Sequence, residues 1–122
     1  MNYPIRVRST AVIIEQNSIL LIEYNDENGL HYNLPGGGVQ TGESVQEALQ
    51  RELQEEACCN VAVGDLIWVY EYAPHLDQLR FGSTPSLSLC FACKRVGGYG
   101  MPDVPDEWQT AVTFLPLPQL PQ

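Results

Sequence analysis

The chain has 122 residues, and 44% of them are apolar, which is enough for one folded domain with a hydrophobic core. It carries 15 acidic and 6 basic residues, which gives a net charge of −9. Such an acidic surface repels the phosphate backbone, which argues against a nucleic-acid polymer as partner. No apolar run is long enough to cross a membrane, and the N-terminus does not fit a signal peptide, so we expect a cytoplasmic protein without a membrane partner.

The first elements in chain order are two apolar, β-branched runs. STAVII (9–14) and SILLIEY (18–24) are separated by three polar residues, which predicts a pair of strands. The polar stretch 25–33 predicts a turn, because its acids and amides do not fall in the register of a calcium-binding loop. The glycine-rich stretch LPGGGVQTGES (34–44) then interrupts regular structure, and a helix is expected from about Ser44 to Ala57.

Three more strands are predicted after the helix, and a Gly/Pro-rich loop separates the last two. Strands on both sides of one central helix predict a mixed α/β fold. Neither a repeat nor a linker is visible, so we expect a single domain over residues 1–122. The three strand candidates are LIWVYEYA (66–73), SLSLCFACKRV (86–96) and WQTAVTFLPL (108–117).

The predicted helix carries carboxylates where an apolar stripe is expected. At about 100° per residue, Glu52 and Glu56 fall within the stripe that contains Leu49. Glu55 falls at its edge, and Arg51 falls on the solvent side. Buried unpaired carboxylates are costly, so they would need arginine partners, protons or bound cations, and hard divalent cations suit such clusters. The alternative is a helix rotated so that these glutamates reach water at one end of the core.

The four cysteines allow either a zinc site or free thiols. Cys90 and Cys93 have the spacing of a zinc-ligand pair, which Cys58 and Cys59 could complete. Cys90 and Cys93 are three apart in a predicted strand, however, and therefore point to opposite faces. Adjacent cysteines also chelate poorly together. In a reducing compartment free thiols are favoured.

The glycine-rich stretch and the helix together resemble the Nudix box of the Nudix hydrolase family. The resemblance lies in residues 37–59, GGVQTGESVQEALQRELQEEACC, and the flanking LPGG and the later PDEW are also similar to the family. The match extends over nearly the whole chain in element order. The residues that match the box at its spacing are Gly37, Glu43, Arg51, Glu52, Leu53, Glu55 and Glu56.

The resemblance implies a Nudix-like α/β/α sandwich with a central mixed sheet. It also implies a metal-dependent hydrolase that uses Mg²⁺, or Mn²⁺, to cleave the pyrophosphate linkage of a nucleoside diphosphate derivative. The substrate would be a small-molecule nucleotide such as a nucleoside triphosphate or an ADP-ribose-like compound. A homodimer is left open. The alternative function is a non-catalytic Nudix-fold module that senses a nucleotide.

The resemblance also implies roles for individual residues. Arg51 would orient the glutamates, with Glu43 as its partner. The general base would be a helix glutamate or an acid of the late loop, for which Glu107 is the candidate and Asp103 and Asp106 are the alternatives; a solvated loop acid is the competing interpretation of Glu107. The implied metal ligands are Glu52, Glu55, Glu56 and the carbonyl group of Gly36.

Two departures from the family pattern carry their own predictions. Cys58 stands where the family has a glycine that closes the helix in a left-handed conformation, so we expect the helix to continue and to close near Asn60, which tolerates that conformation better. The family's C-terminal helix has no counterpart in the final PQLPQ, so either that helix is missing from the given stretch of chain or the domain is trimmed.

Other polar and aromatic residues allow contacts with a nucleotide but do not by themselves predict them. An arginine outside the box is more often a surface residue, and an aromatic residue in a strand is more often part of the core. The loops 24–33, 75–85 and 97–106 are expected to choose the substrate. The residues considered as phosphate or base contacts are Arg8, Arg80, Arg95, Tyr32 and Trp68.

Overall fold

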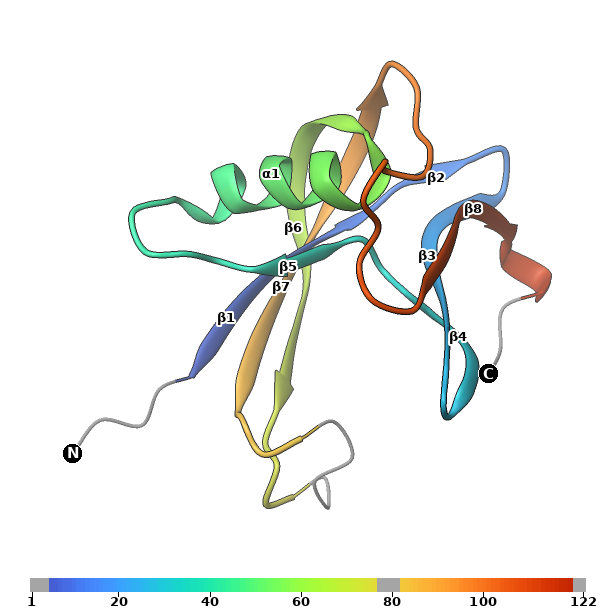
Figure 1. Ribbon diagram of the computed structural model, residues 1–122. Helices are drawn as coiled ribbons and strands as arrows, with labels where there is room; N and C mark the ends of the chain where they lie inside the picture. The colour runs from blue at the N-terminus through green and yellow to red at the C-terminus, as the bar shows by residue number, and fades with distance from the viewer. Residues whose placement is uncertain (1–4, 77–81, 120–122) are drawn as a thin grey trace.

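A computed structural model describes residues 5–76 and 82–119. This part of the chain contains strands, one α-helix and a short 3-10 helix (Figure 1). Loop residues 77–81, which include Arg80, lie outside the described residues. The elements are β1 (Arg6–Val12), β2 (Ile14–Glu15), β3 (Ser18–Asp26), β4 (Gly29–Asn33), β5 (Gly36–Gly38), α1 (Val45–Ala57), β6 (Asn60–Tyr72), β7 (Ser86–Val96), β8 (Gln109–Pro116) and η1 (Leu117–Gln119).

The strands form two sheets. The first has the order β5-β1-β7-β6 and is mixed, because β1 and β7 run parallel whereas its other neighbours run antiparallel. The second contains β2, β3 and β4, with β8 paired to β3. Figure 1 shows α1 lying across the first sheet, with the second sheet to one side. The mixed sheet and the α/β class that the sequence predicts are therefore confirmed.

Helix α1 packs its apolar face on the first sheet. Leu49 and Leu53 are fully buried and lie in one core cluster with Ala11 and Ile13 of the β1 region. Burial of each leucine side chain stabilises the fold by about 2 kcal/mol. Because side chains alternate along a strand, the intervening residues of β1 face away from the helix. One face of this sheet therefore packs against α1, and the other face carries a different set of side chains.

The helix is defined at both ends by local contacts. At its start, the Ser44 side chain accepts a hydrogen bond from the Glu47 N–H, and the Glu47 carboxylate accepts one from the Ser44 N–H. This reciprocal capping box satisfies two N–H groups that the helix leaves free. Helix α1 begins one residue after Ser44, as the sequence predicts.

The helix ends at Cys58, so the prediction that it closes near Asn60 is wrong. Cys58 has φ 50° and ψ 39°, which is the left-handed conformation that the family's glycine would adopt. Asn60 already begins β6, and the Gly100 N–H donates a hydrogen bond to the carbonyl of Ala57. Strand pairing and this loop contact therefore impose the closure on a residue that has a Cβ atom.

Three strand predictions differ from the structure. The two N-terminal runs do not form one hairpin: β1 lies in the first sheet, and only the short β2 pairs with β3. The stretch 25–33 is mainly a hairpin in which β4 pairs with β3, and Gly29 with φ 98° supports its turn. Strand β6 starts six residues earlier than predicted because pairing with β7, with register shifts between Val63 and Trp68, overrides the low strand propensity of Gly64 and Asp65.

The described residues contain one helical layer. Strand β8 leads into η1, a single 3-10 turn, where the family pattern has a further helix. The second helical layer of the expected α/β/α sandwich is thus not among residues 5–76 and 82–119. Within the same residues, α1 is the only α-helix, and it is neither long nor apolar enough to span a bilayer.

Candidate active site

Glu56 is a buried carboxylate at the junction of α1 and β5. Its side chain is only 6% exposed. One carboxylate oxygen accepts a hydrogen bond from the Gly36 N–H at 2.8 Å, and the other accepts one from the Tyr24 hydroxyl at 3.2 Å. Burial raises the pKa of Glu56 to about 7, and the nearby charges of Glu52 and Asp106 add to this increase. The fold thus holds an acid that titrates near neutrality.

Two glycines of β5 allow the strand to approach both its neighbour and the helix. Gly36 has φ 147°, and a Cβ atom there would lie 2.2 Å from the carbonyl oxygen of Ser9. At Gly37, a Cβ atom would lie 2.5 Å from the carboxylate carbon of Glu52. Because neither position has room for a side chain, the glycines place the β5 backbone directly against the carboxylates of the helix.

Arg51 connects four acceptors around the same strand. Its guanidinium donates two hydrogen bonds to Glu43, at 2.7 and 3.0 Å, and one to Glu52 at 2.9 Å. A longer bond of 3.3 Å reaches Glu55, and another reaches the carbonyl of Gly38. The hydrogen bonds from Arg51 lower the pKa of Glu43. The pairing of Arg51 with Glu43 that the resemblance implies is therefore present. Helix periodicity alone placed Arg51 on the solvent side, but its long side chain reaches back from the edge of the helix.

Glu52, Glu55 and Glu56 differ in their surroundings. The Glu52 side chain is 17% exposed and paired with Arg51, whereas Glu55 is 58% exposed. Glu56 is the most buried of the three, and it forms no ion pair with any residue of the described chain. A buried carboxylate without a cationic partner has to bind either a proton or a cation.

The donor set suits a hard divalent cation. Carboxylate oxygens from Glu52 and Glu56 lie next to β5, and backbone carbonyls of that strand are further oxygen ligands of the type that Mg²⁺ accepts. The described residues do not hold three acidic, histidine or cysteine side chains already gathered as a metal cluster. Glu52 is held by Arg51, and the Glu55 side chain is largely exposed.

The late loop approaches the helix end through Asp106 and Gln109. The Gln109 amide donates a hydrogen bond to the carbonyl of Glu56 at 2.8 Å, and its amide oxygen accepts one from the Asp106 N–H. Asp106 and Glu107 are both exposed, and the charge of Asp106 contributes to the raised pKa values of Glu56 and Tyr24. Asp106 and Glu107 both stay candidates for the late-loop acid.

A comparison with known protein families finds a match over most of the chain. The family model described as the NUDIX domain matches residues 5–122. The chain belongs to the Nudix family. Its Nudix box is the segment that runs from β5 through α1, so the residues quoted for the resemblance are those that surround Glu56.

Curated relatives share part of the chain. A protein of Bacillus subtilis (strain 168) that is named for 8-oxo-dGTP diphosphatase activity is 40% identical over 74 residues, which is 59% of this chain and 48% of the relative. The human 8-oxo-dGDP phosphatase NUDT18 is 33% identical over 91 residues, which is 68% of this chain and 28% of that protein. The chain spans less than half the length of both relatives.

Solved structures show the same fold. A MutT Nudix hydrolase from Burkholderia pseudomallei superposes with a TM-score of 0.80 at 24% identity, covering 98% of this chain and 88% of that one. An ADP-ribose pyrophosphatase from Streptococcus suis gives a TM-score of 0.72 at 22% identity, covering 97% and 78%. At these identities the likeness establishes the Nudix fold alone.

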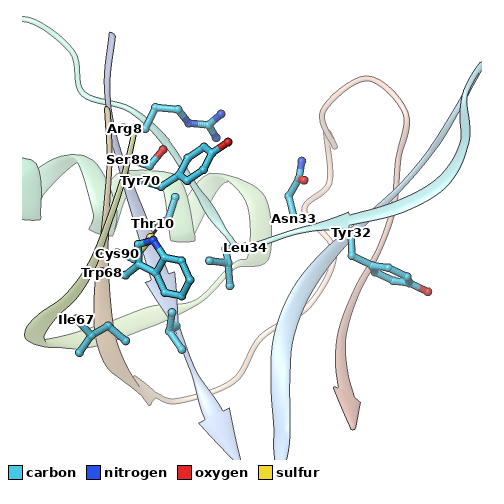
Figure 2. A pocket seen from close by; sticks show the side chains of 11 residues that line it. Arg8, Thr10, Tyr32, Asn33, Leu34, Ile67, Trp68, Tyr70, Ser88 and Cys90 are labelled. Atoms are coloured by element: carbon cyan, nitrogen blue, oxygen red, sulfur yellow. Dashed lines mark hydrogen bonds between the residues drawn. The ribbon is translucent and has the colours of Figure 1, made fainter. Parts of the chain in front are cut away.

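A cavity opens on the face of the first sheet that is turned away from the Nudix helix. This sheet pocket has a volume of about 490 Å³ and is drawn in Figure 2. Trp68 and Tyr70 of β6 line one side, and Asn33 and Leu34 line the other. Trp68 is 64% exposed, so the usual core role of a strand aromatic does not apply to it. Aromatic faces beside an amide provide what is needed to hold a base.

The cysteines do not gather at one place. Cys93 belongs to the core beneath the Nudix helix, whereas Cys90 lines the sheet pocket and accepts a hydrogen bond from the Thr10 hydroxyl. The opposite orientation of this pair is therefore confirmed. All four cysteines are free thiols, and Cys58 is the exposed one.

Sequence reasoning did not identify Tyr24 and Gln109 as site residues. Tyr24 ends an apolar run and looked like part of a strand core, and Gln109 follows the PDEW stretch without any motif of its own. Both reach Glu56 over long sequence separations, the tyrosine through its hydroxyl and the glutamine through its amide. Their positions in the chain gave no signal, because only the folded arrangement brings them to the helix.

Proposed function

We propose that the protein is a Nudix hydrolase that cleaves the pyrophosphate linkage of a nucleoside diphosphate derivative with the help of Mg²⁺ or Mn²⁺. The observation that carries the proposal is Glu56, a buried carboxylate without an ion-pair partner that faces β5 beside Glu52. Such a carboxylate destabilises the fold unless a ligand compensates it. Glu52, Glu55, Glu56 and the carbonyl of Gly36 are the ligands that we assign.

The protein groups have separate tasks in this mechanism. Arg51 holds Glu52 and Glu43 in place, and Tyr24 and the Gly36 N–H fix the orientation of the Glu56 carboxylate. A bound divalent cation would stabilise negative charge on the phosphate oxygens and favour deprotonation of water. The general base is a helix glutamate or Asp106, which the Gln109 turn brings toward Glu56. Glu107 is the alternative late-loop acid.

The substrate that we propose is a purine nucleoside tri- or diphosphate. The names of the two curated relatives point to oxidised guanine nucleotides. The sheet pocket is consistent with this class, because Trp68 and Tyr70 offer aromatic faces and Asn33 offers an amide that can both donate and accept hydrogen bonds. The proposed partner is thus a small-molecule nucleotide.

The test is a release assay for phosphate and pyrophosphate over a nucleotide panel that includes 8-oxo-dGTP and 8-oxo-dGDP, with Mg²⁺, Mn²⁺ or EDTA. Wild type should cleave at least one nucleotide only with a divalent cation. Glu52→Gln and Glu56→Gln should each lower kcat by at least about 10²-fold. The exposed Glu71→Gln is the matched control and should keep full activity, because Glu71 lies outside the loops expected to choose the substrate.

Binding of Mn²⁺ should be measured in parallel by electron paramagnetic resonance. Glu56→Gln should weaken Mn²⁺ binding, whereas Glu71→Gln should not. Full turnover in EDTA, or wild-type activity in Glu56→Gln, would contradict the proposal. Tight nucleotide binding without turnover would instead support a sensing module.

A further inference from the structure

A second cavity adjoins the sheet pocket at the N-terminal end of β1. This arginine pocket has a volume of about 290 Å³, and its lining includes Arg6, Arg8, Tyr70, Thr84, Ser86 and Ser88. Its described lining residues include hydroxyl groups and two guanidinium groups but no Asp or Glu. The whole chain has a net charge of −9, whereas the charged residues of this concave surface are positive. Guanidinium and hydroxyl groups donate hydrogen bonds to phosphate oxygens.

The arginines of this pocket differ from the other two arginines of the described chain. Arg51 is surrounded by carboxylates, and Arg95 is held by a bidentate pair with Glu15. Arg6 and Arg8, in contrast, form no ion pair with any residue in 5–76 or 82–119. The Nε atom of Arg8 is buried and has no hydrogen-bond partner among the described residues. A buried donor without a partner is costly, and an anion in the pocket would satisfy it.

The location of the arginine pocket relates it to the site on α1. The Arg6 side chain lies over Gly38, where a Cβ atom would be 2.7 Å from its Nε, whereas the preceding Gly37 faces the carboxylate of Glu52. Strand β5 therefore has carboxylates on one face and an arginine on the other. Arg8 is also close enough to Tyr24, the partner of Glu56, for its charge to act on that hydroxyl.

The arginine pocket is continuous with the sheet pocket. Arg8, Tyr70 and Ser88 line both cavities, and Figure 2 shows them together at one end of the sheet pocket. A nucleotide that places its base against Trp68 therefore has guanidinium and hydroxyl donors at the edge of its own binding site. Arg8 is the residue that such a ligand would reach first.

We propose that the arginine pocket binds a phosphate group of the substrate other than the one held by the helix glutamates; this rests on the function proposed above. Two sources provide the same chemistry. One is the terminal phosphate of a nucleoside 5′-triphosphate, and the other is a phosphate ester on the ribose. The pocket thus selects nucleotides that carry one phosphate group in addition to the two phosphates joined by the cleaved linkage.

The first experiment measures binding without turnover. Inorganic pyrophosphate is titrated calorimetrically into the protein in EDTA, so that the helix glutamates have no cation through which to hold it. Wild type should bind, and Arg8→Gln should bind roughly tenfold to hundredfold more weakly, the effect of losing a charged hydrogen-bond donor. Arg6→Gln should show a loss in the same direction.

Lys94→Gln is the matched control. It removes the same charge from an exposed lysine that lines neither the arginine pocket nor the sheet pocket. Thermal melts establish that all variants are folded. Equal binding of pyrophosphate by wild type and Arg8→Gln, or an equal loss in Lys94→Gln, would overturn the proposal.

The second experiment separates the two sources by kinetics. dGTP is compared with dGDP, and a nucleoside diphosphate with a 3′-phosphate is compared with the same compound without it. In Arg8→Gln, KM should rise about tenfold for the substrate whose extra phosphate the pocket holds, with kcat unchanged. Its counterpart without that phosphate should be unaffected.

A uniform loss of kcat on every nucleotide would refute the pocket's role in selection. If wild type cleaves no nucleotide, the proposed hydrolase function fails. The pyrophosphate titration would still decide whether the arginine pocket binds anions. The two proposals can therefore fail separately.

Discussion

The two faces of the first sheet differ in how their polar groups are satisfied. On the face beneath α1, Arg51 bonds three carboxylates and a backbone carbonyl, and Glu56 accepts two hydrogen bonds. On the opposite face, Arg6 and Arg8 border open cavities and have no carboxylate partner within the described chain. On the helix face, most polar groups already bind other protein groups. On the opposite face, the arginine side chains are available to bind a ligand.

The difference reflects how each face is encoded. The residues beneath α1 come mostly from one contiguous segment, the Nudix box. Those of the cavities come from β1, β4, β6 and β7, which are far apart in the chain. The family chemistry therefore depends on a short segment, whereas substrate selection depends on strands that only the fold brings together. The predictions below are designed to separate the two faces.

The largest expected effect comes from the two neighbouring glycines of β5. Gly37→Ala places a methyl group on the carboxylate of Glu52, and Gly38→Ala places one on the side chain of Arg6. Displacement of a catalytic group by about 1 Å costs roughly 10²-fold in rate, so we expect Gly37→Ala to lower kcat by about that factor. Gly38→Ala should mainly change KM, because Arg6 is flexible and lies on the other face.

Steady-state kinetics of both variants with Mg²⁺ check this comparison. Similar kcat values for Gly37→Ala and wild type would show that Glu52 tolerates displacement. A large loss of kcat in Gly38→Ala alone would reverse the assignment of the two faces.

The next effect concerns the stability of the metal-free protein. The pKa of Glu56 is about 7 in the fold, against 4.5 for an ordinary glutamate, so the folded chain binds more protons between these values. The free energy of unfolding of wild type in EDTA should therefore fall as pH rises from about 4.5 to about 7. Glu56→Gln lacks this fall and should be more stable above pH 7 by roughly 3 kcal/mol.

Urea unfolding in EDTA at a series of pH values measures this difference. Glu52→Gln is the comparison, because Glu52 is paired with Arg51 and its replacement should give no stabilisation. If Glu56→Gln is the less stable protein at pH 8, the carboxylate is a structural acceptor for Gly36 and Tyr24 and not a site in need of a cation.

The smallest effect lies at the end of the helix. Cys58 has φ 50°, in the left-handed region. This conformation is strained for a residue with a Cβ atom but not for glycine. Cys58→Gly should raise the free energy of unfolding by about 1 kcal/mol, after allowance for the greater entropy of glycine in the unfolded chain. Activity should not change, because the side chain of Cys58 is exposed and its thiol donates a hydrogen bond to the carbonyl of Met101.

A thermal melt detects a change of this size in a domain of this length. Ala at the same position should give no stabilisation, since alanine keeps the Cβ atom. Equal stability of the glycine variant and wild type would show that the Cys58 thiol compensates for the strain.

The sequence by itself determined the family segment, the start of the helix next to Ser44 and the carboxylates on the buried side of that helix. Short-range rules suffice for these features, because spacing along a helix fixes which residues share a face. The same rules located β7 and β8, whose alternating apolar runs are bounded by glycine or proline. The orientation of Cys90 and Cys93 followed from strand alternation alone.

Only the tertiary structure decided the contacts that cross long stretches of chain. It brought Tyr24 and Gln109 to Glu56, and it turned the guanidinium of Arg51 inward from the solvent side of the helix. It also left the Nε atom of Arg8 without a hydrogen-bond partner among the described residues. It also closed the helix at Cys58, where local propensity favours Asn60. The physical reason is that strand pairing and burial act between residues that are distant in sequence, and their combined free energy exceeds the local preferences of single residues.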